Sequence, residues 1–295
     1  MSLLKRFRVV LVLPAALSAG CNMVLLHPPG AVAAQQGHLI VVSTILMLLV
    51  IVPVIALTVL FAWRYRKSNT EATYSPDWDH STQLELVIWA APLLIIIALG
   101  AVTWISTHTL DPYRSLRRTN GAGSIAVDTK PLTVEVVALD WKWLFIYPEQ
   151  GIAVVNELAA PADVPITFKI TASSVMNSFF IPALAGQIYA MPGMETELHA
   201  VMSSPGDFDG FSANYSGAGF SDMRFKFHSM SARDFEHWVQ TVKAGGQALN
   251  RDGYLQLERP SEHETVRRYA TVADGLYDSI LNRTVTGANI EAGAP

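Results

Sequence analysis

Five positions in the second half of the chain have the spacing of a binuclear copper site but lack its donor atoms. Such a site needs thiolate and imidazole ligands that converge from two loops, because these soft ligands select copper over harder cations. The expected pattern is a histidine in one loop, followed in a second loop by C-x3-C-x3-H-x2-M. The corresponding positions here are Asn177, Ser212, Ser216, Phe220 and Met223. Serine has no thiolate and phenylalanine has no lone pair, so only the methionine remains as a ligand and we expect no metal.

Two histidines and five methionines offer another set of copper donors, since thioethers suit Cu(I). They are His199, His228, Met176, Met191, Met194, Met202 and Met230. Their spacing matches no single coordination geometry, and each histidine alternates with apolar residues in a strand pattern. We therefore expect the histidines on the exposed surface and the methionines as filling in the hydrophobic core.

Three segments around these positions alternate apolar and polar residues with the period of a half-buried strand. They are LTVEVVAL at 132–139, DVPITFKIT at 163–171 and RFKFH at 224–228. Short strands separated by turns that contain proline and glycine are typical of a β-sandwich. The sequence therefore predicts that a sandwich holds the five positions.

Two further segments give the chain a resemblance to a known family. DWKWLFIYPEQG at 140–151 and SVMNSFFIP at 174–182, together with the spacing of the five positions, closely resemble subunit II of the cytochrome bo-type ubiquinol oxidases. These enzymes are the quinol-oxidising branch of the haem-copper oxidases. The resemblance covers nearly the whole chain and implies a cupredoxin-like sandwich in which the five positions are vacated copper-ligand positions.

The same resemblance implies that the redox chemistry belongs to a partner. Oxidase subunit I is expected to carry two haems and one copper, with further small membrane subunits and membrane lipid around it. Ubiquinol would be the substrate of the complex, whereas cytochrome c would not be a partner. This chain itself would bind no cofactor and no metal.

Composition indicates a membrane protein with one ordinary globular part. The chain has 295 residues, of which 51% are hydrophobic, and its mean hydropathy is +0.29, which is high for a soluble protein. Its formal charge is −4, so nothing favours a nucleic-acid partner. The single cysteine, Cys21, allows no intrachain disulfide.

The first twenty residues have the pattern of a secretory leader. Basic residues at Lys5, Arg6 and Arg8 precede the apolar run VVLVLPAAL, and LSAG stands directly before Cys21. Small residues before a cysteine are typical of a bacterial lipoprotein cleavage site, and the family resemblance implies that Cys21 becomes the lipid-bearing mature N-terminus. The alternative is a free thiol buried at the start of a membrane span.

Two charge-free runs predict a transmembrane hairpin over residues 38–108. They cover 39–63 and 86–107, and each is long enough to cross about 30 Å of hydrocarbon. The basic residues after the first run are Arg64, Arg66 and Lys67. They place the connecting loop in the cytoplasm, and a cleaved leader places both mature termini in the periplasm of a bacterial inner-membrane protein. Neither run contains an ionisable side chain that would conduct protons.

The remaining chain divides into four expected parts. A periplasmic N-terminal segment covers 21–37, a linker 109–131, the cupredoxin-like domain 132–230 and an aromatic-rich helical tail 231–295. In the tail, Ser231 and Asp234 predict a capped helix with Phe235, Trp238, Val239 and Val242 on its apolar face. Ser261 and Glu264 predict the start of a second helix that carries Val266, Tyr269, Leu276, Tyr277 and Ile280.

Three other residues have both a functional and a plain interpretation. Glu85 is the last charge before the second span. The family resemblance implies that a glutamate here marks the cytoplasmic mouth of a proton path into subunit I, whereas the plain interpretation is an interfacial carboxylate stabilised by the helix dipole.

Trp141 and Trp143 lie two apart on a strand and point the same way. In copper-bearing relatives this segment lies near the point where electrons arrive, but here we expect ring packing at the sandwich surface or against a partner.

We therefore expect a non-redox subunit II of a proton-translocating ubiquinol oxidase that braces and caps subunit I and contributes Glu85. The alternative is a lipid-anchored periplasmic binding module that works independently of an oxidase. An electron-carrying cupredoxin is excluded by the missing ligands.

Overall fold

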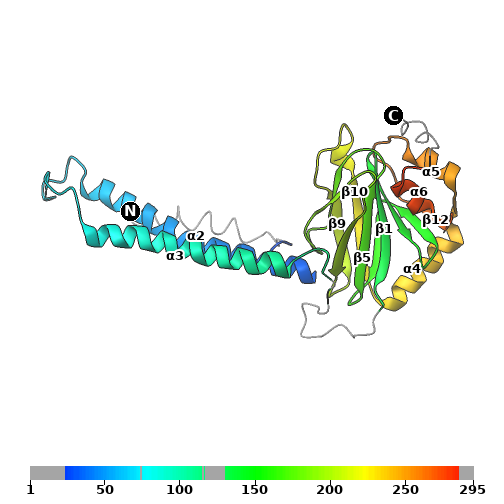
Figure 1. Cartoon of the computed structure of the whole chain (residues 1–295), viewed down its shortest axis with the longest axis horizontal. Coiled ribbons are helices and arrows are strands. Elements are labelled where there is room, and N and C mark those ends of the chain that lie inside the picture. The colour runs from blue at the N-terminus through cyan, green and yellow to red at the C-terminus, as the bar shows by residue number, and fades with distance from the viewer. Residues whose placement is uncertain (1–23, 74, 115, 117–129, 286–295) are drawn as a thin grey trace, which may run out of the picture.

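The computed structural model describes residues 24–73, 75–114, 116 and 130–285, so the expected leader and Cys21 lie outside the described residues. A long helical hairpin projects from one side of a β-sandwich, and the C-terminal helices lie on the side of the sandwich away from the hairpin (Figure 1). Membrane hairpin and globular domain therefore form one elongated molecule.

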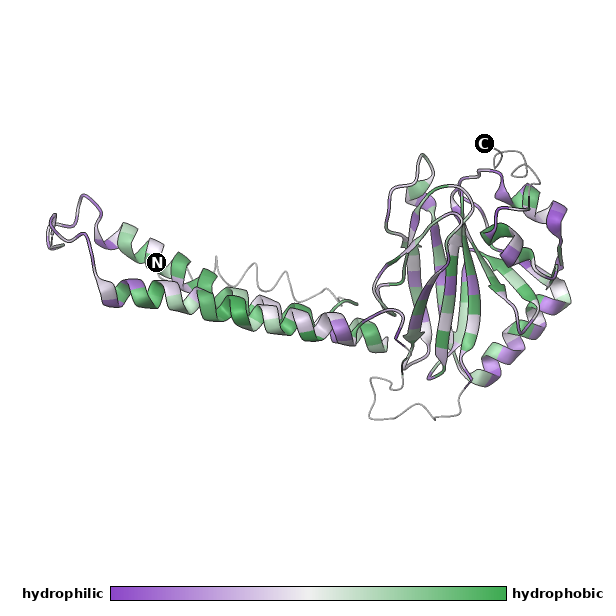
Figure 2. Ribbon diagram, viewed as in Figure 1, coloured by the Kyte–Doolittle hydropathy of each residue, from purple (hydrophilic) through white to green (hydrophobic). Residues whose placement is uncertain are grey.

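The hairpin consists of α2, Ala31–Arg64, and α3, Thr82–Thr109. Both helices are long and apolar enough to cross a membrane, and their surfaces are hydrophobic along most of their length (Figure 2). Helices that are apolar all round are typical of membrane spans. The first helix begins before the predicted span at 39, because residues 31–37 already form its first two turns.

The start of α2 is embedded in the sandwich. The Gly30 N–H donates to the carbonyl oxygen of Ala183 over 2.9 Å, and Ser203 N–H donates to the Pro29 oxygen over 3.1 Å. A Cβ atom at Gly30 would collide with the backbone of Leu184, so only glycine fits this close approach. The hairpin is thus held to the sandwich by backbone contacts at the start of α2.

The described strands form two packed sheets, as predicted. The strands are β1 Leu132–Leu139, β2 Lys142–Tyr147, β3 Ile152–Val155, β4 Glu157–Pro161, β5 Pro165–Ala172, β6 Asn177–Phe180, β7 Ile188–Ala190, β8 Thr196–Val201, β9 Gly206–Ser212, β10 Arg224–Met230, β11 Gln247–Leu249 and β12 Arg267–Val272. One sheet has the order β11-β12-β3-β2-β1-β5-β8 and the other β4-β10-β9-β6-β7.

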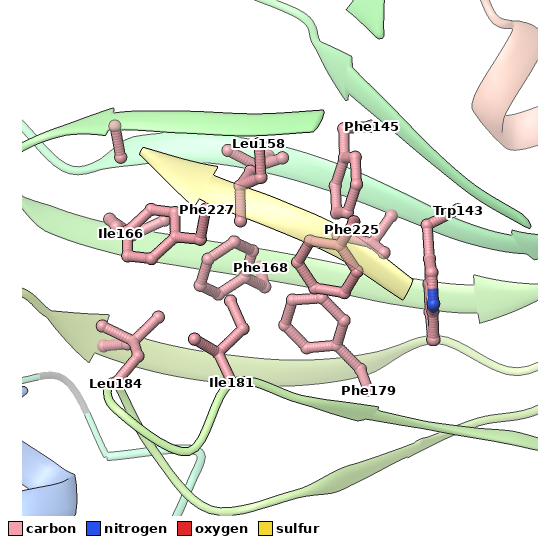
Figure 3. Packing of buried hydrophobic residues seen from close by; sticks show 14 of the residues in the cluster. Trp143, Phe145, Leu158, Ile166, Phe168, Phe179, Ile181, Leu184, Phe225 and Phe227 are labelled. Carbon is pink, nitrogen blue, oxygen red and sulfur yellow. The ribbon is translucent and has the colours of Figure 1, made fainter. Parts of the chain in front are cut away.

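Aromatic rings fill the space between the two sheets (Figure 3). Phe179 and Phe225 stack with ring centroids 5.5 Å apart, and Trp143 meets Phe179 edge-on at 5.4 Å. Such pairs contribute about 0.5–1.5 kcal/mol beyond the burial of their area. Trp143 has 0% exposure, so the expectation that it packs at the sandwich surface is wrong, whereas Trp141 is partly buried in the turn before β2.

The tail is only partly helical. Its helices are α4 Ala232–Gly245, α5 Arg251–Glu258 and α6 Leu276–Leu281. The predicted helix capped by Ser231 is confirmed as α4. Ser231 accepts a hydrogen bond from the Asp234 N–H over 3.1 Å, and Phe235, Val239 and Val242 of the predicted apolar face are buried.

The helix predicted from Ser261 is wrong. Ser261 does donate to the Glu264 carboxylate over 2.7 Å, but no helix begins there, and residues 267–272 form β12. Only Leu276, Tyr277 and Ile280 of the predicted helix are helical, as the buried face of the short α6. This strand pairs antiparallel with β3. Pairing with a distant strand has overridden the local capping signal.

The part of the tail after α4 covers the outer face of the seven-stranded sheet and forms a second core with it. Members of this core include Leu139, Leu144, Val155, Tyr254 and Tyr277. The strands β2 and β3 are consequently buried at every position. Burial on both faces explains why KWLFIY and IAVV read as continuous apolar runs instead of alternating.

Candidate functional site

The positions of the expected copper pattern lie together at one end of the sandwich. Asn177 begins β6 and Ser212 ends β9. The Ser212 hydroxyl lies 3.1 Å from Asn177 Oδ1, and the Ser212 N–H donates to the Met223 carbonyl oxygen over 3.1 Å. All three residues are buried. Strand pairing therefore brings the first, second and last of the five positions into contact.

The other two positions lie in the loop between β9 and β10. Phe220 starts a short 3-10 helix, Phe220–Asp222, and its ring centroid is 5.7 Å from that of Tyr215. The Ser216 carbonyl accepts a hydrogen bond from the Trp141 indole over 3.0 Å, while the buried Ser216 Oγ has no hydrogen-bond partner among the described residues. A Cβ atom at Gly219 would meet the Trp141 ring. The loop is thus packed directly onto the indole.

This pocket does not have the donors of a copper site. Its five side chains are an amide, two hydroxyls, a phenyl ring and one thioether, and a lone thioether is a weak ligand set. Across the part of the chain that the structure describes, there is no group of three or more His, Cys, Asp and Glu residues that could hold a metal. The arrangement holds a loop shape and supplies no redox centre.

The two histidines considered for a substitute copper site lie on different sheets. His199 is on β8, where its Nδ1 is 3.1 Å from Thr167 Oγ1, and His228 is on β10, where its Nδ1 is 2.6 Å from Asp207 Oδ1. Both face away from the core between the sheets, but they are half-buried rather than fully exposed. Each is engaged with a polar neighbour on its own sheet face, so the two do not form a shared site.

Glu85 lies in the first turn of α3, as the sequence predicted. Its N–H donates to the Ser81 carbonyl oxygen over 3.0 Å, and its Oε1 is 2.8 Å from Nδ1 of His80. His80 Nε2 is in turn 3.1 Å from Thr82 Oγ1. Sequence reasoning missed His80, although a histidine five positions before an acidic residue at a helix start is a visible signal.

An apolar face extends along α3 from Glu85 toward the middle of the helix. Thr82, Glu85, Leu86, Trp89, Ala90 and Leu93 line an open hollow of about 470 Å³. Their spacing of three and four residues places them on one side of the helix. Glu85 therefore marks the polar end of a surface that suits an apolar partner.

Buried polar contacts join the tail to the DWKW segment. Lys142 is 1% exposed, and its ammonium donates to the Arg259 carbonyl oxygen over 2.8 Å and to Ser261 Oγ over 2.6 Å. Burial lowers the pKa of Lys142 below its usual value. Asn156 accepts from the Trp143 N–H over 2.8 Å and donates to the Glu264 carbonyl over 2.9 Å. A lysine inside an apolar strand was the overlooked sequence signal for this link.

A cluster of carboxylates lies on the outer face of the seven-stranded sheet, next to α6. Burial raises the pKa of Glu135 on β1 to about 7, with further contributions from Asp278 and Glu195 and an opposing one from Lys169. Lys169 Nζ is 3.5 Å from Glu195 Oε1. The contact between α6 and the sheet therefore contains a group whose charge changes near neutral pH.

Two protein-family models match the chain. The model described as "Cytochrome C oxidase subunit II, periplasmic domain" matches residues 147–230, and "COX Aromatic Rich Motif" matches residues 243–288. The first match covers much of the sandwich and the second most of the tail.

Proteins of established name are similar over almost the whole length. The chain is 52% identical to "Cytochrome bo(3) ubiquinol oxidase subunit 2" of Pseudomonas putida over 267 residues, which covers 90% of this chain and 82% of the relative. It is 50% identical to "Ubiquinol oxidase subunit 2" of Acetobacter aceti over 273 residues, covering 92% and 86%. A solved periplasmic domain of subunit II of cytochrome oxidase from Bradyrhizobium japonicum is 24% identical, with a TM-score of 0.37, covering 38% of this chain and 94% of that one. The identity and coverage of the first two relatives establish that the chain belongs to the subunit II family of the ubiquinol oxidases and is a subunit of such an oxidase.

Proposed function

We propose that this chain is a non-redox subunit II of a proton-translocating ubiquinol oxidase in a bacterial inner membrane, where it braces subunit I and presents Glu85 at the cytoplasmic mouth of a proton path. The observation that carries the proposal is the position of Glu85. It is the acidic residue in the first turn of α3, and its carboxylate ends the apolar face over Leu86 and Trp89. A membrane partner on that face brings its own side chains to the carboxylate.

The side chains at the five copper-pattern positions explain why we assign the redox chemistry to subunit I and not to this chain. Copper chemistry needs thiolates or imidazoles, and the five positions provide a single thioether. Quinol oxidation and oxygen reduction then take place on two haems and one copper in subunit I. The sandwich then serves as a cap for the partner.

The bracing role rests on how the hairpin is attached. The hydrogen bond from Gly30 to Ala183 and the buried residues Ala31, Val32 and Ala33 fix the start of α2 within the sandwich. A partner that packs against the two helices therefore also fixes the position of the periplasmic domain.

We further propose that Cys21 is the lipid-bearing mature N-terminus, with both termini in the periplasm. Cys21 is three residues from Val24, and the Leu25 carbonyl packs against Gly37 of α2, two residues before the charge-free run begins at Leu39. This contact supports the proposal, because it keeps the chain at Leu25 beside the start of the charge-free run, where an acyl chain on Cys21 would insert. Measurement of the intact mass of the mature protein tests the lipidation of Cys21. A chain that keeps residues 1–20, or that carries no lipid mass, would rule this proposal out.

Glu85→Gln tests the role in proton uptake. A carboxylate accepts and releases a proton, whereas an amide of the same shape does not. The variant oxidase should assemble with normal haem content but oxidise quinol more slowly than wild type. Equal turnover per haem at every pH would reduce Glu85 to an interfacial charge worth about 0.3–1 kcal/mol through the helix dipole.

Purification of the protein from the membrane separates the proposed oxidase function from that of an independent periplasmic binding module. After mild solubilisation the full-length chain should copurify with haem and with subunit I. A chain that elutes alone and free of haem would favour the binding module.

A further inference from the structure

The imidazole of His80 lies between Glu85 and Thr82 at the start of α3. Its Nδ1 is 2.8 Å from Glu85 Oε1, and its Nε2 is 3.1 Å from Thr82 Oγ1. The side chains of His80 and Glu85 are 61% and 51% exposed. Both ring nitrogens are thus engaged, yet the pair stays open to solvent on the loop side.

The partners of the two nitrogens restrict where the ring carries protons. An ionised carboxylate only accepts hydrogen bonds, so Nδ1 carries a hydrogen when it faces Glu85. A hydroxyl both donates and accepts, so the Nε2 that faces Thr82 is compatible with a neutral ring and with an imidazolium. The geometry holds a donor against Glu85 and places the opposite nitrogen beside a hydroxyl that fits either protonation state of the ring.

We propose that His80 collects protons from the cytoplasmic side and delivers them to Glu85, a role that rests on the proton-uptake function proposed for Glu85. One proton from water adds to Nε2 and makes the imidazolium. The Nδ1 proton then moves to Glu85 Oε1, which leaves a neutral ring with its hydrogen on Nε2. Nε2 then releases a proton to water and Nδ1 takes one up from water, which restores the first tautomer, and Glu85 passes its proton to the partner.

The surroundings of Glu85 explain why such a residue is useful. Leu86, Trp89 and Leu93 extend from Glu85 along one face of α3, and a partner subunit on that face removes water from this side of the carboxylate. His80 lies in the loop before α3, on the side that the proposed orientation places in the cytoplasm. Histidine is also a residue type that serves as a proton shuttle, because its two ring nitrogens can accept a proton on one side and donate one on the other.

Turnover of the assembled oxidase across pH tests this role. The variants are His80→Gln, His80→Ala, Glu85→Gln and the double variant His80→Gln with Glu85→Gln, and the matched control is His237→Gln, an exposed histidine of α4. Copurified haem confirms assembly for each. Glutamine keeps a hydrogen-bonding group near Glu85 but does not titrate in this range.

The expected result is a loss that grows with pH. At about pH 6, Glu85 takes protons from water directly and His80→Gln turns over almost as fast as wild type. At about pH 8.5, where protons are scarce, the variant should be slower by roughly twofold or more, since a positioned acid–base group is typically worth at least that factor. The double variant should match Glu85→Gln, because both residues act in one path. Added imidazole buffer should accelerate His80→Ala much more than wild type.

The outcomes separate the two proposals. If Glu85→Gln is slow but both His80 variants match wild type at every pH, the His80 role is wrong and the Glu85 function stands. If the His80 variants are slower by the same factor at every pH and imidazole does not help, His80 only supports the local structure and the relay is likewise wrong. If Glu85→Gln turns over like wild type, both proposals fail together.

Discussion

The indole N–H of Trp141 donates a hydrogen bond to the carbonyl oxygen of Ser216 over 3.0 Å, and the ring lies against Gly219 in the same loop. This contact joins the DWKW turn to the loop that carries two of the five copper-pattern positions. The loop shape is therefore maintained by packing and hydrogen bonds from the protein itself. A metal is not needed to hold it.

A copper site should consequently be restored by four substitutions. Asn177→His, Ser212→Cys, Ser216→Cys and Phe220→His together supply two thiolates and two imidazoles beside Met223, which is the soft donor set that copper prefers. We expect the purified full-length variant to bind copper in near-stoichiometric amount and to gain a visible absorption band.

The matched control for this experiment is the same variant with Ser216 left unchanged, which offers a single thiolate and should not form the binuclear site. Metal analysis and absorption spectra of the two proteins give the answer. A well-folded fourfold variant that takes up no copper would show that the loop positions do not converge as the strand pairing indicates.

Lys142 should be important for the stability of the tail. Lys142→Met removes the donor to the Arg259 carbonyl and to Ser261 Oγ. The Ser261 hydroxyl keeps its bond to Glu264, so the Arg259 carbonyl is the acceptor left unpaired, which typically costs about 1–3 kcal/mol. We expect the free energy of unfolding of the periplasmic part to fall by about that amount, together with faster protease cleavage near residue 260.

Lys226→Met is the comparison for Lys142. Lys226 also lies on a strand, but its ion pair with Asp209 is exposed, and exposed pairs contribute about 0–1 kcal/mol. Denaturant unfolding of both variants under identical conditions provides the test. A similar small change in both would mean that the buried ammonium is not what attaches the tail.

The sequence predicted those parts of the fold whose signals are local. Apolar runs revealed the hairpin, alternation revealed β5 and β10, and Ser231 with Asp234 revealed α4. The strand β12 was missed because its antiparallel partner, β3, lies more than a hundred residues earlier, and no periodicity within 261–272 reports such a pairing. A locally plausible capping box at Ser261 gave way to this long-range contact.

In the candidate site, too, local signals could be read from the sequence, whereas contacts between distant strands could not. The five copper-pattern positions were predicted from spacing, and the structure brings Asn177, Ser212 and Met223 into direct contact. The burial of Trp143 was not foreseen, because its environment depends on Phe179 and Phe225 from the opposite sheet. Residue types and spacing indicate chemistry, whereas the face of a ring that becomes buried depends on the packing of distant strands.

Glu135 should make the contact between α6 and the sheet sensitive to pH. Burial next to Asp278 and Glu195 raises the pKa of Glu135 from 4.5 to about 7. A raised carboxyl pKa means that its contribution to stability is complete below about pH 4.5 and is lost as pH rises through about 7. Above that pH the ionised Glu135 faces other carboxylates, with Lys169 as the opposing charge.

Glu135→Gln should remove this pH dependence, because an amide keeps the shape of the carboxyl group and does not ionise. At about pH 5 the variant and wild type should have similar stability. At about pH 8 the variant should be more stable by about 1–2 kcal/mol, a range already reduced for the partial exposure of the group to solvent. Denaturant unfolding at both pH values, with hydrogen exchange of the α6 amides as a local probe, measures the difference.

The control is Glu236→Gln on the exposed face of α4, which should follow wild type at both pH values. Parallel pH profiles for wild type and Glu135→Gln would show that Glu135 remains ionised throughout and that α6 is held independently of its proton.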